Sequence, residues 1–215
     1  MEISEETEQW LRDAGYEYYC FVSYPKIHQD MRRFALGVKE AIEKQLAASV
    51  QAPRVFVDDK NIPRGTDWEA IVQRALCRSV VMVALCLGAY YRSAHKWCGL
   101  EWAAMEQLGA RRLRGSMLRP IMPVMLRLEM PIPHAVLKTQ YVKMPAASLT
   151  WDKYCATVEF KRNIRDIVDY IGDVAEAIAT NQAGAGHCRE FTFPKESAFV
   201  GWRAAKQEFP FHNQT

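Results

Sequence analysis

Apolar residues recur every three or four positions in three segments of the chain, which are 30–48, 68–77 and 157–180. This spacing predicts amphipathic helices that each bury one face. A further helical pattern begins near residue 93 and continues to about Arg112, where Gly109 and Gly115 weaken and end it. Short runs of apolar, aromatic and β-branched residues lie between the helices and predict strands. The predicted strands are 16–22, 54–57, 79–87, 120–126 and 140–142.

The run 79–87 (SVVMVALCL) is apolar throughout, which is typical of a strand buried on both faces of a parallel sheet. Alternating strands and helices then predict an α/β layer fold with right-handed crossovers. We expect a flavodoxin-like, doubly wound fold, in which a five-stranded, mainly parallel sheet of order 2-1-3-4-5 carries helices on both faces. This order places a topological switch point between strands one and three, so a ligand site is expected outside their carboxyl ends. Pro120 and Pro123 favour a position near the sheet edge for strand four.

The chain divides into four parts by composition. Residues 1–15 form an N-terminal lead segment, and residues 16–180 form the α/β domain. Residues 181–187 (NQAGAGH) are mostly small, which predicts a flexible linker. Residues 188–215 are too aromatic for a disordered tail, so we expect this extension to dock on the domain or on a partner. Its aromatic residues are Phe191, Phe193, Phe199, Trp202, Phe209 and Phe211.

Composition and charge exclude several classes of protein. The net charge of +3 is too small to indicate direct nucleic-acid binding, and the basic cluster 111–119 is expected to be a solvated helix end and loop. No apolar run reaches the roughly 18–20 residues of a membrane span, and the acidic N-terminus does not resemble a signal peptide. We therefore expect a soluble, cytoplasmic protein without membrane contact.

The six cysteines show no spacing typical of a metal site, so no metal is expected. Cys20, Cys77 and Cys86 lie in apolar runs, which predicts small, buried and reduced thiols.

The candidate chemistry concentrates in the stretch 93–102 (SAHKWCGLEW). Because this stretch opens a helix, Glu101 is expected near a helix N-terminus, which favours the ionised carboxylate. The switch point brings the end of strand one, at Ser23, to the same mouth. The stretch therefore predicts a ligand site, and the alternative is a solvated Glu101 that pairs with a surface Lys or Arg.

Four motifs follow one another between residues 16 and 145 and together resemble the TIR domain family, in a style closer to bacterial members. The motifs are Phe21-Val22-Ser23-Tyr24, then Val57-Asp58-Asp59 with Ile62-Pro63-Arg64-Gly65 and Trp68, then Ala75-Leu76-Cys77-Arg78-Ser79, and finally Tyr90, Ser93, Trp97-Cys98 and Glu101 as a "WC-x-x-E" segment. The acidic residue usual after the first motif is displaced to Asp30, so the resemblance leaves open the shape of this loop and any contact from Lys26 or His28.

Catalytic members of this family cleave the nicotinamide–ribose bond of NAD⁺ and depend on the glutamate of the "WC-x-x-E" segment. The resemblance implies that Glu101 is catalytic and that NAD⁺ is a substrate, with no cofactor. It also implies that the other motif residues surround the substrate. These residues are Ser23, Tyr24, Asp58, Arg64, Trp68, Tyr90, Ser93, Trp97 and Cys98.

Loss of nicotinamide leaves positive charge on the ribose, as in glycoside cleavage, and a nearby carboxylate stabilises that charge. One carboxylate suffices because the leaving group is already cationic and needs no general acid. Without the resemblance, packing is the better explanation of Trp68 and Trp97, because aromatic residues at helix starts pack more often than they stack on a ligand. A Cys98 nucleophile is the weaker alternative to packing, because no histidine-based system accompanies it.

We therefore expect an NAD⁺ glycohydrolase or ADP-ribosyl cyclase of bacterial anti-phage defence, activated by assembly. The resemblance implies self-association through the loop 58–67 and an activating or sensor protein as partner. The residues leave hydrolysis and cyclisation both open. The alternative functions are a non-catalytic TIR module for protein–protein interaction and a nucleotide-binding domain of unrelated function.

Overall fold

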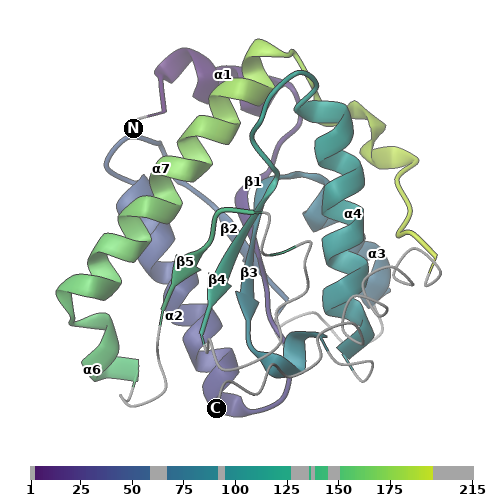
Figure 1. Ribbon diagram of the computed structural model, residues 1–215. Helices are drawn as coiled ribbons and strands as arrows, with labels where there is room; N and C mark the ends of the chain where they lie inside the picture. The colour runs from purple at the N-terminus through teal and green to yellow at the C-terminus, as the bar shows by residue number, and fades with distance from the viewer. Residues whose placement is uncertain are drawn as a thin grey trace, which may run out of the picture.

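The computed structural model describes residues 3–58, 67–91, 95–126, 136, 139–144 and 151–195. A five-stranded sheet of order β2-β1-β3-β4-β5 lies at its centre, and every strand pair is parallel (Figure 1). This sheet confirms the predicted flavodoxin-like topology. The strands are β1 (Tyr18–Ser23), β2 (Val55–Val57), β3 (Ser79–Cys86), β4 (Ile121–Met125) and β5 (Val142–Lys143).

Helices cover both faces of the sheet, as predicted (Figure 1). One face carries α2 (Gln29–Leu46) and α7 (Val158–Thr180), with α1 (Glu5–Asp13) against α7 and the short α6 (Trp151–Cys155) before it. The other face carries α3 (Trp68–Cys77) and α4 (Lys96–Arg112). Two 3₁₀ helices, η1 (Gly88–Tyr91) and η3 (Ala185–Arg189), complete the described elements.

The central strand β3 is buried at every position, which the uniformly apolar run predicted. It pairs with β1 on one side and with β4 on the other. The core divides into one cluster on each face of the sheet, so β3 side chains pack alternately against the α2–α7 layer and the α3–α4 layer.

The fourth strand lies one place in from the sheet edge. The two-residue β5 pairs only with Val124 and Met125, so Pro123 lies outside the β4–β5 ladder. The sheet therefore accommodates a proline inside β4 because the edge strand beside it is so short.

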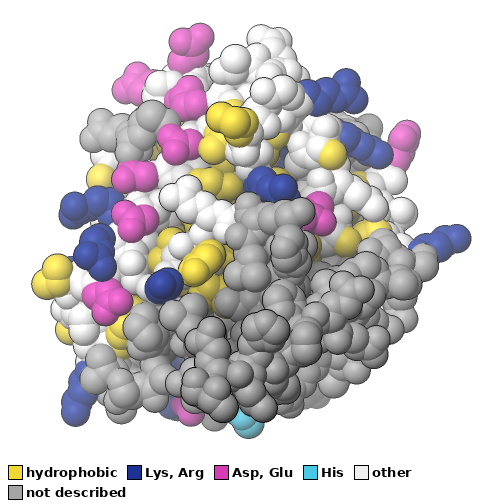
Figure 2. Space-filling view, in the orientation of Figure 1, with side chains coloured by type: hydrophobic (Ala, Val, Ile, Leu, Met, Phe, Trp, Pro, Cys, Tyr) yellow, Lys and Arg dark blue, Asp and Glu magenta, His cyan; other side chains and the backbone are white. Residues whose placement is uncertain are grey.

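The outer surface of α7 is charged, and its inner surface is apolar. Figure 2 shows acidic and basic side chains of both signs spread over this side of the molecule. Exposed Lys161, Arg162, Arg165 and Asp166 alternate with buried Ile164, Ile167 and Val168 along the helix. The predicted amphipathic helix is confirmed. Among the described residues, no helix combines the length and the apolar character needed to cross a membrane.

One expectation for the end of α4 is confirmed and another is wrong. The helix continues through Gly109 and ends at Arg112, as predicted, and the absent Gly109 side chain lets Pro120 pack closely against it. Arg112 was expected to be solvated but is only 1% exposed. Its guanidinium turns inward and donates to the carbonyl oxygens of Cys77 and Ser79, so backbone acceptors inside the fold replace water.

The expectation of a free thiol at Cys77 is also wrong, since the structure pairs Cys77 with Cys188 in a disulfide. The partner comes from η3, which is 111 positions away in the chain. No local spacing indicated this pair, whereas Cys20 and Cys86 are buried free thiols, as expected.

We predict that Gly109→Ala destabilises the fold by about 1–3 kcal/mol, since a Cβ at this position would lie 2.3 Å from Pro120 Cγ. The clash outweighs the roughly 1 kcal/mol that alanine ordinarily gains in a helix. Urea unfolding measures the change. Gly186→Ala is the control, because nothing lies within 4 Å of its Cβ position. Equal stability of the two variants would contradict the packing argument.

Candidate active site

A cavity of about 380 Å³ opens beyond the carboxyl ends of β1, β2 and β3. Its volume lies within the usual range for small-molecule sites. It occupies the switch point between β1 and β3, where the topology predicted a ligand site. The lining residues are Val22, Ser23, Tyr24, Lys26, Asp58, Trp68, His95, Trp97, Cys98 and Glu101.

The carboxyl group of Glu101 lies at the buried wall of this cavity and is only 5% exposed. Ser23, the last residue of β1, donates a hydrogen bond from Oγ to Glu101 Oε2 at 2.5 Å. The same Ser23 Oγ lies 2.8 Å from the hydroxyl oxygen of Tyr90 in η1. Three elements from separate parts of the chain thus converge on one carboxyl group.

Burial raises the pKa of Glu101 to about 8. The Ser23 hydrogen bond and Lys26 oppose this rise, and the charge of Asp58 adds to it. The expectation that the helix N-terminus favours the ionised form is wrong. Because α4 begins at Lys96, Glu101 lies beyond the first turn, where the helix dipole acts most strongly, and desolvation dominates. The Glu101 carboxyl group is therefore mostly neutral at pH 7.

The facing wall is built around Asp58, which directly follows β2. Its carboxylate accepts hydrogen bonds from Lys26 Nζ and, at 2.8 Å, from Trp68 Nε1. The Lys26 ammonium also lies 4.9 Å from the centre of the Trp68 ring, which is a cation–π distance. Tyr24 donates from its hydroxyl to the Asp58 carbonyl oxygen at 3.2 Å. This wall combines a fixed ion pair with an aromatic surface.

Two indole rings form the aromatic part of the cavity. Trp68 and Trp97 meet edge to face, with ring centres 4.7 Å apart and planes at 85°. The two residues come from α3 and α4, which pack side by side on the same face of the sheet (Figure 1). At the start of α3, Asp67 accepts a hydrogen bond from the Ala70 backbone N–H, and this N-cap sets where Trp68 begins the helix.

Cys98 lies beside Glu101 but is not placed to react. Burial raises the pKa of its thiol well above the ordinary value, and the neighbouring Glu101 raises it further. A cysteine nucleophile requires the thiolate, so this environment opposes the role. The geometry favours the packing interpretation of Cys98.

The structure brings most of the predicted site residues together. Tyr90 lies behind the cavity wall, where it contacts Ser23. Arg64, Ser93 and the loop residues 59–66 lie outside the described residues. The predicted residues that line the cavity are Ser23, Tyr24, Asp58, Trp68, Trp97, Cys98 and Glu101.

Three residues that line the cavity were not among the predicted site residues, namely Val22, Lys26 and His95. A contact from Lys26 was left open, although its position three residues beyond the end of β1 places it at the switch point. His95 is partly buried and lines the cavity. Within the described ranges, no group of three His, Cys, Asp or Glu side chains is placed to hold a metal ion.

Comparison with protein families matches residues 20–155, which are more than half of the chain, to the TIR domain. Searches of curated proteins and of solved structures return no match.

We predict that Glu101→Gln stabilises the fold increasingly as pH rises. The folded-state pKa of about 8 exceeds the ordinary value of 4.5, so the folded wild type binds more protons than the unfolded chain between these pH values. Wild-type stability therefore falls as pH rises through this window, whereas glutamine has no charge to bury. Between pH 5 and pH 9, the free energy of unfolding of Glu101→Gln should rise relative to that of the wild type by on the order of 3 kcal/mol.

Urea unfolding at several pH values measures this difference. Glu106→Gln is the matched control, because Glu106 is an exposed carboxylate on the same helix, and its difference from wild type should stay within about 0.5 kcal/mol. Parallel pH profiles for wild type and Glu101→Gln would show that Glu101 is not protonated by burial.

Proposed function

The chain belongs to the TIR domain family, and we propose that it cleaves the nicotinamide–ribose bond of NAD⁺ with Glu101 as the catalytic carboxylate. The observation that carries this proposal is the buried Glu101 carboxyl group in the wall of the switch-point cavity. A surface carboxylate would be solvated and paired, whereas this group faces a cavity of ligand size beside two indole rings.

The charge of the substrate suits this environment. The nicotinamide ring of NAD⁺ is cationic, and an opposite charge close to a carboxyl group lowers its pKa. Binding of the ring beside Glu101 therefore favours the ionised carboxylate, which burial alone disfavours. The same carboxylate remains in place as the charge moves to the ribose.

In the bond-breaking step, the bond between ribose C1′ and the nicotinamide nitrogen breaks, and its electron pair leaves with neutral nicotinamide. The positive charge passes to the ribose, where Glu101 stabilises it without proton transfer to the leaving group. Water or a ring nitrogen of the same nucleotide then adds to C1′. Addition of water releases one proton and gives ADP-ribose, and addition of the ring nitrogen gives a cyclised ADP-ribose.

The other cavity residues supply binding. Trp68 and Trp97 offer aromatic surface to the nicotinamide or the adenine ring. The half-exposed ammonium of Lys26 adds positive charge for the pyrophosphate. Ser23 orients the Glu101 carboxyl group through its hydrogen bond.

We place this activity in bacterial anti-phage defence, in a cytoplasmic protein that assembly switches on. This part of the proposal includes self-association through the loop 58–67. It also includes an activating or sensor protein as a partner. Its support is the family membership and the bacterial style of the motifs. A TIR module that only binds other proteins is the alternative, which an inactive wild type would favour.

We predict that the purified protein releases nicotinamide from NAD⁺, alone or under crowding that promotes assembly, and that Glu101→Ala lowers this release at least 100-fold. Glu106→Gln should keep wild-type activity, since Glu106 lies on the exposed face of α4. Chromatography measures nicotinamide, and product mass separates ADP-ribose from its cyclised form. Equal release from wild type and Glu101→Ala would place the chemistry elsewhere.

We predict that kcat/KM for NAD⁺ rises with pH and levels off above about pH 8. The ionised Glu101 is the reactive form, and the pKa of the free enzyme governs kcat/KM. Initial rates between pH 6 and pH 9.5 give the profile. A profile that falls across this range would mean that the neutral carboxyl group is the active form.

A further inference from the structure

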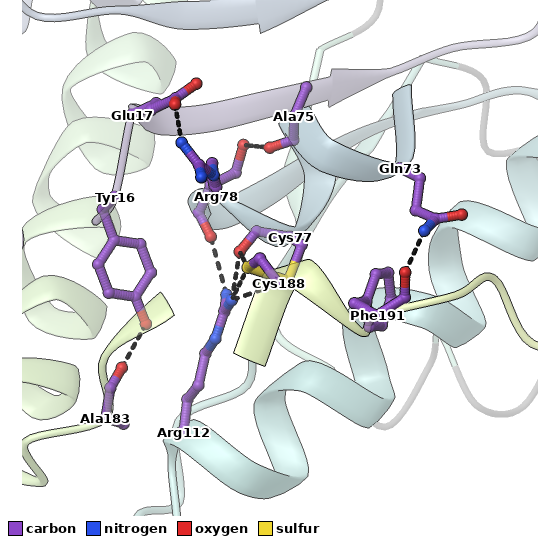
Figure 3. Close-up of a disulfide and its surroundings, with 11 residues drawn as sticks. Tyr16, Glu17, Gln73, Ala75, Cys77, Arg78, Arg112, Ala183, Cys188 and Phe191 are labelled. Atoms are coloured by element: carbon purple, nitrogen blue, oxygen red, sulfur yellow. Dashed lines mark hydrogen bonds and ion pairs between the residues drawn. A yellow bond between two sulfur atoms is a disulfide. The ribbon is translucent and has the colours of Figure 1, made fainter. Parts of the chain in front are cut away.

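A C-terminal segment outside the matched family region reaches the cavity wall. This segment, residues 185–195, is called the strap here. It starts beside α1, where the Ala185 backbone N–H donates to the Ala14 carbonyl oxygen at 2.8 Å. It then follows the outside of α3 and α4 (Figure 1). Gln73 in α3 donates from its side-chain amide to the Phe191 carbonyl oxygen, and the Phe191 ring is buried in the α3–α4 core cluster (Figure 3).

The far end of the strap supports an indole ring of the cavity. Phe193 packs edge to face on Trp97, with ring centres 5.8 Å apart and planes at 70°. Trp97 itself meets Trp68 at 4.7 Å. Both tryptophans line the cavity, but Phe193 does not. Phe193 therefore acts on the site through Trp97, whose ring it contacts without lining the cavity itself.

A disulfide attaches the strap to the domain. It joins Cys188 of the strap to Cys77, the last residue of α3. Cys77 is fully buried and Cys188 is partly exposed, so an attacking thiolate in solvent has access to the Cys188 side of the bond. In the folded domain, this covalent bond holds the strap against the end of α3. Its closed loop, with a sequence separation of 111, also constrains the unfolded chain.

A buried cation lies against both sulfur atoms. The Arg112 guanidinium nitrogen Nη2 lies 3.8 Å from Cys77 Sγ and 3.9 Å from Cys188 Sγ (Figure 3). Nη1 of the same group donates to the Ser79 carbonyl oxygen at 3.0 Å, which fixes the guanidinium in place. A nearby cation stabilises a thiolate, and thiol–disulfide exchange is faster when the leaving sulfur departs as a stabilised thiolate. Arg112 thus favours opening of this disulfide by reductants.

We propose that the strap is a redox-controlled positioning element in which Phe193 holds Trp97 for substrate while the Cys77–Cys188 disulfide is closed. The part of this proposal that concerns NAD⁺ binding rests on the proposed function. Opening requires a dithiol reductant. The bond between the two sulfurs breaks, each sulfur gains one electron and one proton, and the dithiol becomes a disulfide. Disulfides in cytosolic proteins are usually transient and redox-sensing, which fits this role.

The first experiment tests the positioning role of Phe193 with oxidised protein. Phe193→Ala removes the ring behind Trp97, and we expect KM for NAD⁺ to rise about 5–10-fold while kcat stays within about twofold. Phe193→Leu keeps apolar volume at the same place and should recover most of the affinity. A general loss of folding would instead lower kcat and thermal stability in both variants. Unchanged KM in Phe193→Ala overturns the role in substrate binding.

The second experiment tests the disulfide without reference to activity. Hydrogen exchange followed by mass spectrometry compares oxidised and dithiothreitol-treated protein. We expect at least tenfold faster exchange in peptides covering 188–193 and a smaller increase, about threefold, at 95–102. Cys188→Ser should match the reduced wild type and show no response to dithiothreitol. Cys155→Ser is the control, because Cys155 is not one of the two disulfide-bonded cysteines and this variant keeps the disulfide.

Exchange at 95–102 that does not change after complete reduction overturns the strap proposal, whatever the activity. Absence of nicotinamide release from every variant overturns the proposed function instead, and exchange then still decides whether the strap holds Trp97. Faster hydrogen exchange at 95–102 together with a raised KM for NAD⁺ in the reduced protein supports both the strap proposal and the proposed function.

Discussion

The parallel pairing of β1 with β3 is the constraint on which the site depends. Ser23 at the end of β1 lies opposite Ala84 of β3, and the chain leaves these two strands toward opposite faces of the sheet. Because the two segments diverge, a crevice remains between them beyond the carboxyl ends of β1 and β3. One segment supplies Ser23 and Lys26, and the other supplies α4 with Glu101. The site is therefore a consequence of strand order, and any sequence change that moves β1 against β3 would separate Ser23 from Glu101.

The same geometry makes Glu101 costly for stability and useful for chemistry. A carboxyl group that is removed from water resists ionisation, and its pKa of about 8 expresses that resistance. A cationic ligand beside the carboxyl group would lower this penalty, which is the basis of the proposed NAD⁺ chemistry. Sites of this kind trade stability for function. On the opposite wall, the Lys26–Asp58 pair is already satisfied and holds Trp68 in place through its Nε1 hydrogen bond.

The strap extends the functional unit beyond the part of the chain that matches the TIR family. The match ends at residue 155, yet α7 completes one layer of the core and the strap supports Trp97 on the other. Arg112 connects these parts, since it binds carbonyl oxygens at the end of α3 and the start of β3 and contacts both sulfurs of the disulfide. In the proposed switch, the redox state of the disulfide acts on Trp97 through the strap and the Phe193 contact.

The sequence by itself determined the sheet order, the helices on both faces and the candidate carboxylate, because periodicity and short motifs are local signals. The apolar run of β3 and the motif around Glu101 were sufficient for these predictions. Only the tertiary structure decided the protonation of Glu101, the burial of Arg112 and the pairing of Cys77 with Cys188. Each of these depends on contacts between segments far apart in the chain, where burial and neighbouring charges outweigh local preference.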